Sequence, residues 1–99
     1  MEANDSSVPF ALLRRFTAAE SAIYPLAMTD PEGYERVVTV VGTVFRQLRE
    51  DCSTVDALVE RLPAATEQAA ELAADEGLSV DPGVIADAAA VLRYRELRS

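Results

Sequence analysis

The sequence predicts an all-α protein, an antiparallel up-and-down four-helix bundle with helices over about residues 8–28, 31–50, 54–76 and 82–97. Three observations support this fold class. Apolar residues recur at steps of three and four along most of the chain. Asp-Pro pairs at 30–31 and 81–82 have the composition of helix starts. The connections between the helical segments are short, which favours antiparallel neighbours.

The first helix is expected to begin near Val8, because two serines that can cap a helix precede Pro9 and proline fits a first turn. Its apolar stripe consists of Leu12, Phe16, Ala19, Ile23 and Leu26. Pro25 falls inside this stripe and removes one backbone hydrogen bond, which costs about 3 kcal/mol in an undistorted helix. The sequence therefore predicts a kink at residues 21–25.

The second helix is expected to start with Asp30 as its cap and Pro31 at its first position. Residues 36–45 are rich in β-branched side chains, and a buried strand would have a similar composition. Periodicity decides for a helix, because polar and small residues follow one stripe. The opposite side carries Tyr34, Val37, Val38, Val41, Val44, Phe45 and Leu48.

The third helix is expected to follow a capping box made by Ser53 and Asp56 and to end at Gly77. Its apolar register continues through Pro63, which favours one kinked helix, with a break at Pro63 as the alternative. The fourth helix starts after the second Asp-Pro pair. Three arginines near its C-terminus complement the helix dipole: Arg93, Arg95 and Arg98.

Length and charge restrict the class of protein. The 99 residues suffice for one domain, expected over 7–99 after a disordered segment at 1–6. Nine arginines and no lysine oppose seventeen acids, and the net charge of −8 disfavours nucleic acid and anionic lipid as partners. With no apolar run of membrane-spanning length and no secretory signal, we expect a cytoplasmic protein. Arginine without lysine, together with abundant alanine, suggests a GC-rich bacterial source.

The chain lacks the usual equipment of an enzyme, and we expect no catalytic activity, no cofactor and no metal. Histidine and lysine are absent, and Cys52 has no histidine to activate it. We expect Cys52 to be a small buried side chain, with a reactive thiol as the alternative. Glu67, Glu71 and Asp75 share one helix face and could bind a divalent cation, but a solvated acidic face is the simpler interpretation.

Charge is unevenly distributed. Six acids and no base lie between Leu62 and Leu92, whereas arginines gather in the first helix and at the C-terminus. Such a surface can attract a partner with a basic face, or it can serve solubility alone.

Two groups of residues are candidate binding sites. Tyr24, Met28, Tyr34 and Arg36 surround the predicted kink, where they form either a structural joint or a small pocket in which Arg36 binds a carboxylate. Alanines of the third and fourth helices form a candidate interface between chains: Ala70, Ala73, Ala74, Ala86, Ala89 and Ala90. Helix propensity alone is the alternative explanation for these alanines.

These observations favour a non-enzymatic protein–protein interaction or assembly module that forms a homodimer or binds another protein. Its expected interface is the alanine-rich faces of the third and fourth helices or the exposed side of the second helix. The alternative is a regulatory domain that binds a small molecule in the pocket near Tyr24 and Tyr34.

Overall fold

The computed structural model describes residues 10–98, and all of its regular secondary structure there is helical, without a strand. Four long helices and one single-turn helix follow one another: α1 (Phe10–Ile23), α2 (Leu26–Thr29), α3 (Pro31–Asp51), α4 (Val55–Glu76) and α5 (Pro82–Arg98). The predicted all-α four-helix bundle is therefore confirmed. The expected helix start near Val8 and the expected disorder of residues 1–6 lie outside the described residues.

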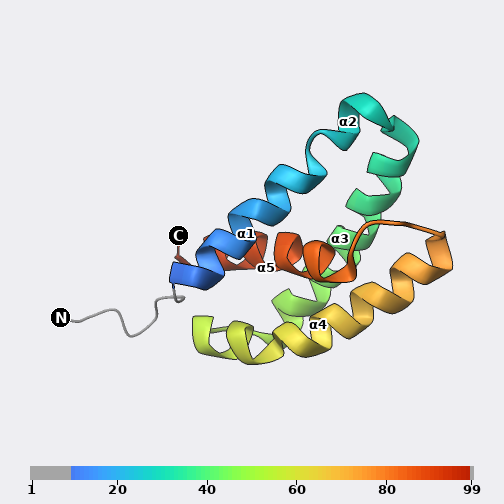
Figure 1. The fold of residues 1–99 in the computed structure, drawn as a ribbon. Helices are drawn as coiled ribbons and strands as arrows, with labels where there is room; N and C mark the ends of the chain where they lie inside the picture. The colour runs from blue at the N-terminus through green and yellow to red at the C-terminus, as the bar shows by residue number, and fades with distance from the viewer. Residues whose placement is uncertain (1–9, 99) are drawn as a thin grey trace.

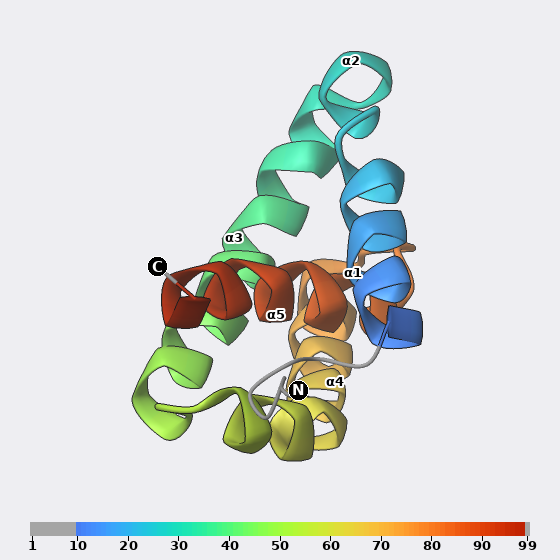
Figure 2. The same cartoon turned by 90° about the vertical axis from the view of Figure 1, so that its left-hand side faces the viewer.

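The kink expected at residues 21–25 inside one helix is instead a break, at which Tyr24 and Pro25 separate two helices. α1 ends at Ile23, and α2 forms one turn before α3 begins. Because Pro25 has no amide hydrogen, the i→i−4 ladder stops, and the amide of Ala27 donates to the carbonyl of Tyr24 at 3.1 Å. Both ribbon views show α1 and α3 diverging from the corner that α2 forms (Figure 1, Figure 2).

Both Asp-Pro pairs start helices, as predicted. At the start of α3, Asp30 Oδ1 accepts a hydrogen bond from the amide of Gly33 at 3.2 Å. At the start of α5, Asp81 Oδ1 accepts from the amide of Gly83 at 2.8 Å. Each carboxylate thus satisfies an amide that has no partner within its own helix.

The prediction that Ser53 caps the third helix is wrong. The cap is Thr54, whose hydroxyl oxygen accepts from the amide of Ala57 at 3.1 Å, because Thr54 is the extended residue directly before the first helical residue. α4 is continuous through Pro63, so the alternative of a break there is excluded. Gly77 ends the helix in the left-handed region at φ 67°, which glycine adopts without steric cost.

The valine-rich segment is helical, but its buried face is rotated from the predicted one. Val38, expected on the apolar side, is 43% exposed, whereas Val40 is buried. The buried face of α3 points toward α4 and α5, which pack on one side of it. It consists of Val37, Val40, Val41, Val44 and Leu48, together with Gly33 near the N-terminus. Val38 lies at the edge of this face and contributes to the surface instead.

Helix α5 occupies the centre of the bundle. It packs on α1, α3 and α4, and it runs across the space between α1 and α3 (Figure 2). All seven residues from Ile85 to Val91 are buried. Because alanine has a small side chain, the other helices can approach α5 closely from several sides.

The predicted alanine interface is wrong for four of its six residues. Ala86, Ala89 and Ala90 are fully buried, and Ala73 of α4 is buried as well. These side chains pack within the interior of their own chain and are not available to a second one. Ala70 and Ala74 are exposed on the outer side of α4.

No helix among residues 10–98 combines the length and the apolar character that crossing a bilayer requires.

Candidate functional site

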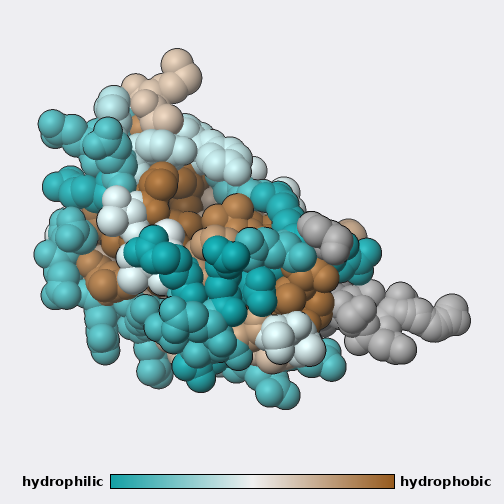
Figure 3. Space-filling view, turned by 180° about the vertical axis from the view of Figure 1, so that it is seen from behind, coloured by the Kyte–Doolittle hydropathy of each residue, from teal (hydrophilic) through white to brown (hydrophobic). Residues whose placement is uncertain are grey.

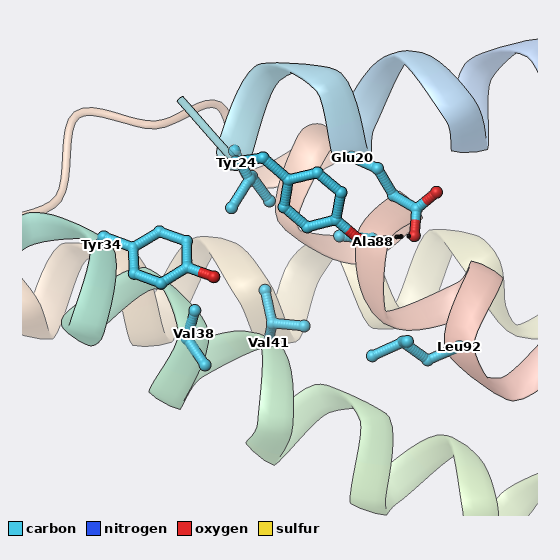
Figure 4. A pocket seen from close by; sticks show the side chains of 8 residues that line it. Glu20, Tyr24, Tyr34, Val38, Val41, Ala88 and Leu92 are labelled. Atoms are coloured by element: carbon cyan, nitrogen blue, oxygen red, sulfur yellow. Dashed lines mark hydrogen bonds between the residues drawn. The ribbon is translucent and has the colours of Figure 1, made fainter. Parts of the chain in front are cut away.

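A half-open apolar groove lies between α1 and α3, with α5 as its floor (Figure 4). Its volume is about 190 Å³. Three helices contribute to it, so the groove depends on how they are arranged in the bundle. The lining residues are Glu20, Ile23 and Tyr24 from the α1 side, Tyr34, Val38 and Val41 from α3, and Ala88 and Leu92 from α5.

Apolar side chains around this groove face solvent. Tyr24 is 58% exposed, Val38 43% and Leu92 38%, and each comes from a different side of the groove. In the space-filling view, hydrophobic atoms gather near the middle of one face with hydrophilic atoms around them (Figure 3). Large exposed apolar side chains around one hollow differ from isolated exposed residues, because together they form a surface that water solvates poorly.

A network of three side chains forms the polar edge of the groove. Arg95 of α5 binds both carboxylate oxygens of Glu20, with N···O distances of 2.7 and 2.8 Å. The hydroxyl of Tyr24 donates to Glu20 Oε2 at 3.1 Å. The Arg95 hydrogen bond lowers the pKa of Glu20, and the same carboxylate raises the pKa of Tyr24. At neutral pH the edge therefore presents an ionised, paired carboxylate and a neutral tyrosine.

The structure brings together two of the four residues predicted to form a pocket. Tyr24 and Tyr34 line the groove from opposite sides, and the Tyr34 ring points into it (Figure 4). Met28 is 88% exposed and does not line the groove. Arg36 lines a separate hollow, because two residues along a helix correspond to a rotation of about 200° away from Tyr34. The predicted carboxylate site at Arg36 therefore does not form at this groove.

Sequence reasoning assigned only Tyr24 and Tyr34 of these residues to a site, and it missed the rest of the groove and its edge. Val38 was assigned to the core, and Arg95 was assigned to the dipole of its own helix. Leu92 and Glu20 were not among the candidate site residues. One local signal existed, since Glu20 and Tyr24 are four residues apart in a helical segment and must lie side by side. Nothing local indicated Arg95, which is 75 residues away from Glu20.

Arg93 has a structural role that its position did not reveal. Its Nε and Nη2 atoms donate to the backbone carbonyl of Cys52, with N···O distances of 3.0 and 2.6 Å. Cys52 is the C-terminal cap of α3, so a side chain of α5 fixes the connection between α3 and α4. Nη1 of Arg93 also binds Glu96 Oε1 at 2.9 Å.

Cys52 is buried, which confirms the expectation of a small interior side chain. Its thiol lies 3.6 Å from the carbonyl oxygen of Ala57. Burial is the main reason that the pKa of this thiol is raised, so it stays protonated and unreactive at neutral pH.

Asp87 is a buried acid that the pattern of acidic residues did not single out. It lies on α5, where Arg15 of α1 donates from Nη2 to Oδ1 at 3.0 Å and from Nε to Oδ2 at 3.3 Å. Burial raises the pKa of Asp87, and the hydrogen bond from Arg15 only partly offsets this effect. One of the six acids between Leu62 and Leu92 is therefore an interior group rather than part of the acidic surface.

The acidic residues of α4 face solvent, as expected for a solvated acidic face. Glu67, Glu71 and Asp75 are all exposed. Among residues 10–98, no three acidic or cysteine side chains are placed so that they could bind one metal ion.

Comparison with protein-family models, with curated proteins and with solved structures finds no match.

Proposed function

We propose that this chain is a non-enzymatic protein–protein interaction module that binds its partner through the groove between α1, α3 and α5. One observation carries the proposal: Tyr24 in the turn after α1, Val38 of α3 and Leu92 of α5 project apolar surface around a single hollow. Surfaces of this kind are typical of protein interaction sites, because burying them against a partner removes apolar area from water.

The size of the groove favours a side chain over a free ligand. Its volume of about 190 Å³ is smaller than the roughly 300 Å³ at which sites for small molecules usually begin. A hollow of this size accommodates one large apolar side chain. The exposed rim then contacts the surface around that side chain, as in interfaces where a central apolar anchor is surrounded by flatter contacts.

The partner we propose is a second copy of this chain. The groove replaces the alanine faces as the surface for self-association, since most of those alanines are interior. Two copies each carry a net charge of −8 and repel one another, so apolar contact must supply the attraction. Added salt screens this repulsion, and we therefore expect self-association to strengthen as ionic strength rises.

Sedimentation velocity over a range of protein concentrations tests the proposal. We expect a dimer that Val38→Asp weakens by at least about tenfold, because the variant places a charge on the apolar rim. Thr39→Asp is the matched control, since Thr39 is the next residue of α3, is exposed, and does not line the groove. A wild-type chain that remains monomeric, or equal effects of the two aspartates, would contradict the proposal.

A small-molecule site in the same groove is the second candidate. The Tyr34 side chain points into the groove, and its hydroxyl has no hydrogen-bond partner among residues 10–98 (Figure 4). A small aromatic molecule with one polar group could bind that hydroxyl and fill the apolar space. This candidate gains support if sedimentation shows a monomer at all protein concentrations and added salt does not change the measured mass of the particle.

A further inference from the structure

Helix α1 is attached to the bundle differently from the other long helices. α3, α4 and α5 each pack on the other two and form a closed set. α1 packs on α5, and otherwise mainly on the short helix α2 that follows it. A helix with one long neighbour loses fewer contacts on separating than a helix with two, so α1 is the element whose separation disrupts the fold least.

The connection between α1 and α2 can act as a hinge. Tyr24 and Pro25 form the turn between the two helices, and Pro25 has no amide with which to continue the helical ladder. α2 itself packs on α3, next to the Asp30 cap. Rotation at this turn therefore moves α1 while α2 stays with α3.

A short apolar stripe and two ion pairs hold α1 on α5. The ion pairs have opposite polarity: α1 supplies the cation Arg15 to Asp87, and α5 supplies the cation Arg95 to Glu20. The cations of both pairs are more than half exposed, so water can replace their contacts when the helices separate. The buried stripe of α1 comprises Phe16, Ala19 and Ile23.

We propose that α1 opens as a unit about the Tyr24–Pro25 turn while α3, α4 and α5 remain folded. The closed position completes the groove, because Glu20, Ile23 and Tyr24 form its α1 wall. Opening removes that wall and exposes the face of α5 on which α1 packs. Any molecule that binds in the groove therefore holds α1 closed, because it binds the closed state alone. The opening itself does not depend on the nature of the partner.

Residue-resolved amide hydrogen exchange, followed by NMR at low protein concentration, tests the proposal. We expect the amides in the second half of α1 to exchange at least about tenfold faster than those of Val41 to Leu48 in α3, with a weaker dependence on denaturant. Equal opening free energies and equal denaturant dependences in α1 and α3 would overturn the proposal, because α1 would then open only when the whole chain unfolds.

A pair of variants distinguishes local opening from a general loss of stability. Glu20→Gln removes the charge that pairs with Arg95 and keeps the size of the side chain, so we expect exchange in α1 to rise about fivefold while exchange in α3 and α4 stays unchanged. Asp51→Asn is the matched control, because it removes the charge from the Arg61 pair between α3 and α4. A rise of the same size in all four long helices for Glu20→Gln, or faster α1 exchange in Asp51→Asn, contradicts the proposal.

Discussion

Ala89→Glu is expected to lower the free energy of unfolding by at least about 4 kcal/mol, a large part of the roughly 5–15 kcal/mol that stabilises a typical domain. Ala89 is fully buried on the central helix, where neighbouring helices leave no room for a longer side chain and no partner for a buried charge. Urea unfolding followed by circular dichroism measures the change.

Ala70→Glu is the matched control for this variant. It makes the same substitution on α4, where Ala70 is exposed, and we expect a change of less than about 0.5 kcal/mol. The comparison also distinguishes an interior position of the α5 alanines from an interface between chains. An Ala89→Glu variant that folds with wild-type stability and differs only in its mass in solution would restore the alanine interface and contradict the central position of α5.

Arg93→Met is expected to lower the free energy of unfolding by about 2 kcal/mol. Methionine preserves most of the apolar stem but leaves the carbonyl of buried Cys52 without the two N–H donors that Arg93 supplies. The turn between α3 and α4 then lacks its link to α5. Urea unfolding measures this loss. The rate at which a thiol-specific fluorescent reagent labels Cys52 reports whether this side chain becomes accessible.

Arg98→Met is the control for the loss of an arginine from α5. Arg98 is exposed in the last turn, and its guanidinium lies over the Tyr94 ring at 5.7 Å from the centroid. We expect this variant to cost less than about 1 kcal/mol. Equal losses in the two variants would show that the arginines act through the helix dipole, as the sequence first suggested, and would contradict a specific role for Arg93.

Local signals predicted the elements of this fold well. The Asp30 and Asp81 caps depend on residues within three positions of each other, and Gly77 marks a helix end by its own conformation. Pro25 interrupts a helix because its ring leaves the backbone nitrogen without a hydrogen to donate. In α3, polar residues at helical spacing over several turns indicated a helix more strongly than the valines indicated a strand. The spacing is the better guide because packing in the fold overrides the intrinsic preference of a residue type.

The faces of the helices were harder to predict than the helices themselves. In α3, valines occupy both the buried face and its edge, so composition did not distinguish Val38 from Val40. In α5, alanines lie on several sides and give little contrast between an inner and an outer face. Only the positions of the neighbouring helices show that this segment is central, and those positions are a property of the whole fold.

The groove was predicted only where its residues are close in sequence. Tyr24 and Tyr34 lie on either side of one corner, so the corner itself brings them together. Leu92 and Arg95 reach the same place from the other end of the chain. Contacts over such sequence separations depend on the packing of α1 on α5, which no local pattern specifies.

Paramagnetic solvent relaxation of methyl groups, measured by NMR on a dilute sample, tests the central claim most directly. The claim is that the alanines of α5 are interior and that accessible apolar side chains, Val38 and Leu92 among them, surround the groove. A soluble paramagnetic agent should relax the methyl groups of Val38 and Leu92 strongly and leave those of Ala86 and Ala89 almost unaffected. Strong relaxation of the two alanine methyl groups, with protection of Val38 and Leu92, would contradict it.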